Sequence, residues 1–257
     1  MKVKLGRLVR VGQIAISVTG LVILCWGTYE VVVYARTTPR FEVQKLSVSG
    51  ARRVAETEVI AKAGFEAGAN IFRINLEEIR SRVEELSWVR HAAVQRILPD
   101  QIVIRVVERE PIGLTRIKGE IYQFDIDGKI LDPDPASGSS FPILDGLRAA
   151  EGKNNVRKVE IYRSVMEELD QTSLSEIHIN DTGEVTVVSA NDPVLINLGV
   201  SDFRNRWVKY LQLKPQIQQQ YPQAVRVDLR FKNQVIIKMK DDETVEKIVW
   251  GTKKNTL

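Results

Sequence analysis

The 257-residue sequence is poor in residues that hold metal ions or carry out acid–base catalysis, with 1 Cys and 2 His. A single cysteine cannot form an intramolecular disulfide, and it cannot supply a cysteine-based zinc site. The two histidines, His91 and His178, lie far apart in the sequence. The chain also lacks Gly-x-Ser-x-Gly, His-Glu-x-x-His, P-loop and Gly-x-Gly-x-x-Gly strings. We therefore expect no enzyme activity, no metal site, no cofactor and no small-molecule substrate.

A strong charge of one sign is also missing. The chain has 37 Lys+Arg against 33 Asp+Glu, a net charge of +4. Four of these basic residues and one acidic residue fall within the first 35 positions: Lys2, Lys4, Arg7, Arg10 and Glu30. The rest of the chain is left with 33 basic and 32 acidic groups. Because the excess lies at the extreme N-terminus and not on a folded face, we expect no nucleic-acid binding.

An uncharged run of 19 residues, Val11 to Tyr29, follows the basic cluster. As a helix it spans roughly 28 Å, about the thickness of the hydrocarbon core of a bilayer. Trp26, Tyr29 and Tyr34 gather at its end, and such aromatic rings prefer the level of the lipid headgroups. The sequence therefore predicts a transmembrane helix over residues 11–34.

The basic cluster in residues 1–10 predicts a cytoplasmic N-terminal tail, with everything after Ala35 on the extracytoplasmic side. A cleaved signal peptide is the competing interpretation, since Val33-Tyr34-Ala35 resembles a cleavage site. The apolar regions of signal peptides are shorter, about 7–15 residues, so we expect the helix to be retained as an anchor.

Residues 41–110 are predicted to form the first folded unit. Its predicted elements, in chain order, are a strand from Phe41 to Val48, helices over 58–63 and from Asn75, and strands over 94–98 and 102–107. Pro111 cannot donate a hydrogen bond to a sheet and marks the boundary. The order β-α-α-β-β predicts a small sheet with two helices on one face.

Residues 111–240 are predicted to form a second unit that is richer in strands. Asp127-Gly128, between two apolar runs, is a strong signal for a hairpin. The other predicted elements are a helix from about Val156, strands over 176–180, 184–189 and 194–198, a helix after Ser201, and a final pair of strands over 225–231 and 235–239. Residues 241–257 are expected to be a C-terminal tail.

The fold class predicted for the chain is α+β. A single transmembrane helix precedes a small β-α-α-β-β domain and a mostly antiparallel β domain with flanking helices. Thr57, Asn75 and Ser201 are expected to cap helix N-termini, and Gly64 to end the first short helix. Pro215 is expected to end or bend the last helix.

Two groups of residues that could suggest ligand sites are interpreted as structural. One has the spacing of a helix face packed in a core: Phe203, Trp207, Tyr210 and Leu211. The other is the local acidic cluster Asp125, Asp127, Asp132 and Asp134. Its prolines and spacing do not fit a calcium loop, so we expect a solvated hairpin turn and loop.

Several strings of the first unit resemble a POTRA domain, and more narrowly that of the bacterial cell-division family FtsQ/DivIB. They are Phe41-x-Val-x-x-Leu-x-Val-x-Gly50, Asn70-Ile-Phe72, Trp88-Val89-x-x-Ala-x-Val94 and Arg96-x-x-Pro99-x-x-Ile-x-Ile-x-Val-x-Glu108-Arg109-x-Pro111. Weaker strings extend the resemblance over nearly the whole chain: Tyr122 to Ile130, Phe141-Pro-Ile-Leu-Asp-Gly146 and Val227-Asp-Leu-Arg-Phe231. The last position of that final motif is often Tyr in the family, and Phe231 lacks the hydroxyl.

The resemblance implies a single-pass scaffold of the division machinery in the cytoplasmic (inner) membrane at the septum. It implies binding to other bitopic proteins of FtsB/FtsL type and a part in regulating septal peptidoglycan synthesis. The alternatives are a POTRA-bearing accessory of an envelope-assembly or secretion system and, from another class, a membrane-tethered hydrolase.

The predicted partner site is the final strand, because a terminal strand has an unpaired edge to which a partner segment can add. The residues assigned to this site are Arg230, Phe231, Val235, Ile236, Ile237, Lys238 and Met239. Lys238 and Lys240 are also what a protected edge without a partner carries, so this alternative remains open.

Overall fold

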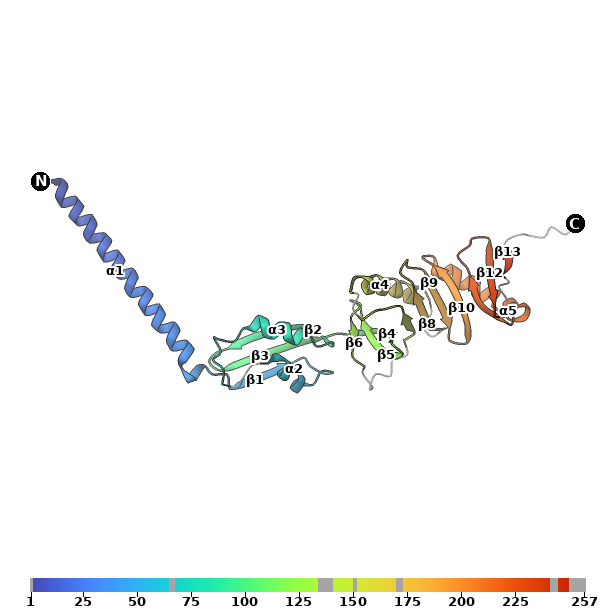
Figure 1. Cartoon of the computed structure of the whole chain (residues 1–257), viewed down its shortest axis with the longest axis horizontal. Coiled ribbons are helices and arrows are strands. Elements are labelled where there is room, and N and C mark those ends of the chain that lie inside the picture. Colours follow the sequence, from blue (N-terminus) through green and yellow to red (C-terminus); the bar gives the residue numbers. More distant parts are fainter. Residues whose placement is uncertain are drawn as a thin grey trace. The chain divides into compact units, whose positions relative to one another are not determined.

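A computed structural model of the chain describes residues 2–64, 68–133, 141–149, 152–169, 173–240 and 245–249 (Figure 1). The chain divides into two compact units, Met1–Glu108 and Arg109–Leu257. Each unit has a sheet of its own.

The first unit begins with the 36-residue helix α1, Lys2–Thr37. Its stretch Ile16–Thr37 is a candidate membrane span of 22 residues, with a mean hydropathy of 1.7 and none of it buried. The residues predicted as the N-terminal tail belong to the same helix from Lys2 onward. A helix needs no tertiary contact to satisfy its backbone, so the charged residues extend it without a break.

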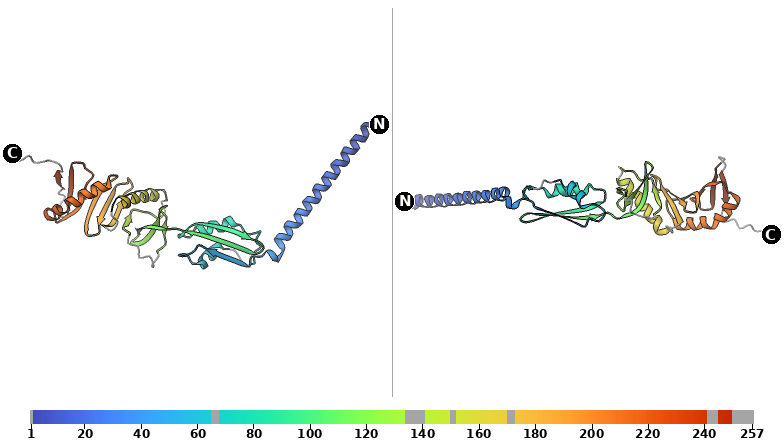
Figure 2. Two further views of the ribbon diagram at one scale, coloured as in Figure 1. Left: turned by 180° about the vertical axis from the view of Figure 1, so that it is seen from behind. Right: turned by 90° about the horizontal axis from the view of Figure 1, so that it is seen from below.

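The rest of the first unit has the predicted order β-α-α-β-β. Its elements are the 3-10 turn η1 (Pro39–Phe41), β1 (Lys45–Ser49), α2 (Glu56–Ala63), α3 (Leu76–Glu84), β2 (Val89–Ile97) and β3 (Gln101–Glu108). The sheet has the order β1-β3-β2, with β1 parallel and β2 antiparallel to the central strand β3. Helices α2 and α3 contact each other and cover one face of this sheet (Figure 2).

The helix ends of the first unit show which local predictions were right. Asn75 caps α3, since its side chain accepts hydrogen bonds from the backbone N–H of Glu77 and Glu78. Gly64 ends α2 in the left-handed conformation, with φ of 61°. Thr57 is not a cap: α2 starts earlier, after Ala55, without a side-chain cap. The acidic side chains in the first turn of α2 instead stabilise its N-terminus, because they interact favourably with the positive end of the helix dipole.

The strand predicted from Phe41 begins only at Lys45. Phe41 closes the 3-10 turn, and its ring packs edge to face on Phe72 at 5.2 Å between centroids. Tertiary packing of this ring therefore replaces the extended conformation that the apolar pattern favoured. Trp88 is buried with 8% of its surface exposed, and the Arg53 guanidinium lies 4.8 Å from its ring centre.

The second unit is built on one large mixed sheet. Its strands are β4 (Pro111–Ile117), β5 (Glu120–Asp125), β6 (Ile130–Leu131), β7 (Ile143–Asp145), β8 (Leu174–Ile179), β9 (Val185–Ser189), β10 (Asp192–Gly199), β11 (Ala224–Asp228), β12 (Gln234–Met239) and β13 (Val245–Val249). Their order across the sheet is β13-β12-β11-β10-β9-β8-β7-β4-β5-β6. The pairs β4–β7, β7–β8 and β10–β11 are parallel, and the others are antiparallel.

Helices α4 (Gly152–Glu168) and α5 (Phe203–Gln220) contact each other and pack on one face of this sheet (Figure 2). Their buried side chains form the core with the sheet: Val159, Tyr162, Val165, Phe203, Trp207, Tyr210, Leu213 and Ile217. The expectation that Trp207 and Tyr210 belong to the core is confirmed.

Two predictions about α5 were wrong. Leu211 is 48% exposed, and Leu213 turns inward instead. Asp202, not Ser201, precedes the first turn, and it makes no side-chain cap. Pro215 was expected to end or bend the helix, and it does not end it, because α5 continues to Gln220. Burial of apolar side chains before and after the proline holds the helix together where the missing N–H disfavours it.

The acidic cluster of the second unit was expected to be a solvated turn and loop. This is wrong for Asp125, which is buried with 1% of its surface exposed. Its Oδ1 accepts hydrogen bonds from the backbone N–H of Asp127 at 3.0 Å and of Lys129 at 2.8 Å. Arg109 Nη1 donates to its Oδ2. Asp125 therefore fixes the turn between β5 and β6 as a buried, paired carboxylate. Asp134 lies outside the described residues.

Candidate functional site

The end of the large sheet differs from the prediction in one respect. β12, which contains Val235–Met239, is not the last strand, because β13 pairs with it in antiparallel fashion. The prediction that β12 has an unpaired edge is therefore wrong. The interpretation of residues 241–257 as only a tail is also wrong, because Val245–Val249 form β13. Val235 and Ile237 face the core and are fully buried, Ile236 and Met239 are half-buried, and Lys238 is exposed.

Arg230 lies in the connection between β11 and β12 and is held by two carboxylates. Its Nη2 is 2.7 Å from Asp228 Oδ2, and its Nη1 is 2.7 Å from Glu184 Oε1. The hydrogen bonds to Asp228 and then to Glu184 raise the pKa of Arg230. The guanidinium is therefore fixed in place, and it also lies 5.9 Å from the ring centre of Phe231. Phe231 is the next residue in the chain, and 40% of its surface is exposed.

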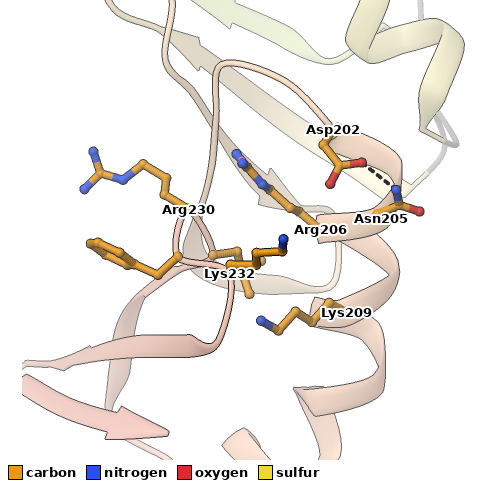
Figure 3. Close-up of a pocket in the computed structure, with 8 residues that line it drawn as sticks. Asp202, Asn205, Arg206, Lys209, Arg230 and Lys232 are labelled. Carbon is orange, nitrogen blue, oxygen red and sulfur yellow. Dashed lines mark hydrogen bonds between the residues drawn. The ribbon is translucent and has the colours of Figure 1, made fainter. Parts of the chain in front are cut away.

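A pocket of about 320 Å³ lies between this connection and the first turns of α5 (Figure 3). It is lined by Asp202, Asn205, Arg206, Lys209, Leu229, Arg230, Phe231 and Lys232. Figure 3 shows Arg206 and Lys209 extending from the helix toward the segment that carries Arg230 and Lys232. Four basic side chains thus line the pocket with a single acidic one, Asp202.

The electrostatics of this basic pocket favour an anion. Arg206 Nη1 donates to the backbone carbonyl of Leu198, which fixes its charge near the pocket. Burial lowers the pKa of Lys209, and the nearby charge of Arg206 lowers it further. Only the Arg206 contribution reflects repulsion between positive charges, and a carboxylate entering the pocket would relieve that repulsion. The pocket therefore has the chemistry to bind an acidic side chain.

Among the residues that line this pocket, the sequence had singled out Arg230 and Phe231 but not Arg206 and Lys209. These residues come from a helix that is distant in the sequence, and no spacing signal connects them to the β11–β12 connection. β13 had a signal: Val245-Glu-Lys-Ile-Val249 is short and β-branched at both ends, after a polar stretch.

A helix that can cross a membrane, a β-α-α-β-β unit and a mixed-sheet unit with a basic pocket define the class as membrane-anchored POTRA proteins. Two protein-family models match the chain: the FtsQ-type POTRA domain over residues 41–109, and the C-terminal domain of cell division protein FtsQ/DivIB over residues 113–230. The chain belongs to the FtsQ/DivIB family of bacterial cell-division proteins, and the resemblance seen in its sequence is confirmed.

Similar proteins cover most of the chain. The cell division protein FtsQ of Koribacter versatilis is 30% identical over 240 residues, which are 88% of this chain and 69% of that protein. The FtsQ of Syntrophotalea carbinolica is 26% identical over 210 residues, 77% of this chain and 74% of that protein. A solved structure, the major extracytoplasmic domain of DivIB from Geobacillus stearothermophilus, is 16% identical and has a TM-score of 0.29. It covers 44% of this chain and 96% of that chain.

Proposed function

We propose that this protein is a non-enzymatic scaffold that binds other single-pass division proteins of FtsB/FtsL type and thereby helps regulate septal peptidoglycan synthesis. Membership of a cell-division family supports this role over a part in secretion or envelope assembly. The observation that carries the proposal is the basic pocket beside the exposed ring of Phe231 at the end of the large sheet.

The partner segment is proposed to place an acidic side chain in the basic pocket and to continue along β12. The pocket is lined by Arg230, Phe231 and Lys232, which lead directly into that strand. A segment paired with β13 instead would lie one strand further from the basic pocket, a distance of about 4.8 Å. We therefore propose that the partner pairs with Val235–Met239 and replaces β13, which pairs with β12 in this structure.

Titration of the full chain in detergent with the extramembrane part of the partner tests the pocket. Replacement of both Lys209 and Lys232 by Gln should weaken binding, with a smaller loss at high salt because dissolved ions screen the attraction between these charges and the partner. Arg204→Gln is the matched control, since Arg204 is exposed on α5 but does not line the pocket. Equal affinities for the double variant and the control would remove the pocket from the mechanism.

Truncation after Lys240 tests which strand receives the partner. If the partner replaces β13, a chain truncated after Lys240 should bind the partner more tightly, because β13 no longer competes for the edge of β12. Loss of binding on truncation, with the fold retained, would move the contact from β12 to β13.

The proposed topology has a cytoplasmic N-terminus and both folded units outside the cytoplasm, at the septum. It is supported by the basic residues before the candidate span of α1. A reporter fused after Leu257 should be active only outside the cytoplasm. Recovery of a soluble form that begins at Arg36 would contradict the anchor.

A further inference from the structure

A second basic pocket, of about 480 Å³, lies in the first unit where α1 ends. Its polar lining includes Arg36, Thr37, Thr38, Glu42, Asn70 and Arg73. The family resemblance assigns nothing to these side chains, apart from Asn70 in a POTRA string.

This pocket is firmly built. Asn70 Nδ2 donates to the backbone carbonyl of Ala35 at 2.9 Å, which ties the turn before α3 to the last turn of α1. The backbones of Glu42 and Asn70 form an antiparallel bridge. The Asn70 side chain also accepts a hydrogen bond from the backbone N–H of Phe72 at 3.0 Å. The two walls of the pocket are therefore joined by direct hydrogen bonds.

The position of the pocket along α1 places it at the membrane surface. The candidate span Ile16–Thr37 ends at the pocket, and the aromatic side chain of Tyr34 is exposed in its last turn. Such rings mark the level of the headgroups, a layer of about 5–7 Å on each side of the hydrocarbon core. The residues lining the pocket follow immediately, so lipid headgroups are the molecules next to it.

The donors of this pocket suit a phosphate. Thr37 Oγ1 and Thr38 Oγ1 already donate to carbonyls of α1, at 2.8 and 2.6 Å. The donors left for a ligand are the guanidiniums of Arg36 and Arg73, and within the described part of the chain neither is paired with a carboxylate. The guanidinium fork binds phosphate oxygens in pairs.

The pocket also contains a feature that suits a cation. Glu42 contributes a carboxylate, and the C-terminal end of a helix carries partial negative charge. A purely anionic ligand would be repelled by both. A headgroup that has a phosphate and an ammonium group matches the whole pocket.

We propose that this pocket binds the headgroup of a membrane phospholipid of the phosphoethanolamine type. Arg36 and Arg73 hold the phosphate, and Glu42 faces the ammonium group. A bound headgroup would clamp the turn at Asn70 to the end of α1. The proposal does not depend on the partner site at the end of the large sheet.

Native mass spectrometry of the full chain in detergent, titrated with short-chain phosphatidylethanolamine, tests the proposal. Arg36→Gln and Arg73→Gln should each weaken binding about tenfold, the loss expected for a charge-assisted hydrogen bond. Arg40→Gln is the matched control, because Arg40 is exposed beside the same membrane surface but does not line the pocket. Its affinity should stay unchanged. Equal effects of all three variants would overturn the site and leave only general attraction between basic residues and lipid.

Two further arms identify the ligand. Phosphatidylethanolamine should bind more tightly than phosphatidylglycerol, and Glu42→Gln should abolish this preference. Tighter binding of phosphatidylglycerol to the unmodified chain would overturn the assignment of the ammonium group.

Inorganic phosphate and glycerophosphoethanolamine should compete only weakly, since a lipid is already held at the membrane or micelle surface beside the pocket. Displacement of the lipid by either at equal concentration would show that the pocket serves a soluble phosphate and would overturn the lipid assignment.

Discussion

The carboxylate of Glu108 ties the end of β3 to the turn after β1, and this contact allows a quantitative prediction. Its Oε1 accepts hydrogen bonds from the backbone N–H of Arg52, Arg53 and Val54 at 2.7, 2.8 and 3.0 Å. Glu108→Gln keeps the shape of the side chain but removes its charge. Hydrogen bonds to charged acceptors contribute about 1.5–3 kcal/mol and neutral ones about 0.5–1.5 kcal/mol. We expect the first unit to lose about 1–3 kcal/mol of its free energy of unfolding at neutral pH.

The loss should depend on pH with a definite sign. Burial by itself raises the pKa of Glu108, but the hydrogen bonds from Val54, Arg52 and Arg53 outweigh it, so the pKa lies below its ordinary value of 4.5. A carboxyl with a lowered folded-state pKa stabilises the fold above its unfolded pKa and loses that effect as the pH falls through the folded one. The difference between the two proteins should therefore close in that acid range, because protonated Glu108 is neutral like Gln.

Hydrogen exchange of the full chain in increasing urea measures this unit separately, through the peptides of β1 to β3. Glu110→Gln is the control, two residues further on at an exposed position. A loss for Glu108→Gln that is equal at neutral and acid pH would show that the charge is not its cause. No loss at neutral pH would show that the three hydrogen bonds contribute no net stability.

Three further predictions concern the two cores and the partner site. Trp88→Ala should cost the first unit about 3–5 kcal/mol while the second stays folded, and joint melting in hydrogen exchange would contradict a boundary near residue 110. Phe231→Ala should weaken partner binding by about 2 kcal/mol in calorimetry without changing the fold; unchanged affinity would show that its exposed ring is no anchor. Asp125→Asn should destabilise the second unit by about 1–3 kcal/mol in urea, because the hydrogen bonds that Arg109 and two backbone N–H groups donate to this buried carboxylate lose their charged acceptor, and unaltered stability would refute that role.

Local signals determined the elements that the sequence predicted well. The uncharged run is long enough to mark a candidate membrane span by itself, because a helix in a bilayer must satisfy its backbone internally. Asn75 caps α3 because the cap and the N–H groups it accepts from lie within three residues. The order of elements in the first unit follows in the same way from periodicity and turn residues. The dense FtsQ-type strings identified the family from the amino-acid sequence alone.

Distant contacts decided the rest, since they join residues whose proximity no local pattern encodes. Pro215 lies within α5 and Leu211 faces solvent because the packing of the helix on the sheet, not propensity, sets its length and its buried face. Asp125 is buried because Arg109 reaches it. The sequence placed the proposed partner site at Arg230 and Phe231, but the basic pocket beside them exists only because α5 folds back against the β11–β12 connection. The pairing of β13 with β12 likewise depends on the finished sheet, whose edge a single strand's sequence cannot place.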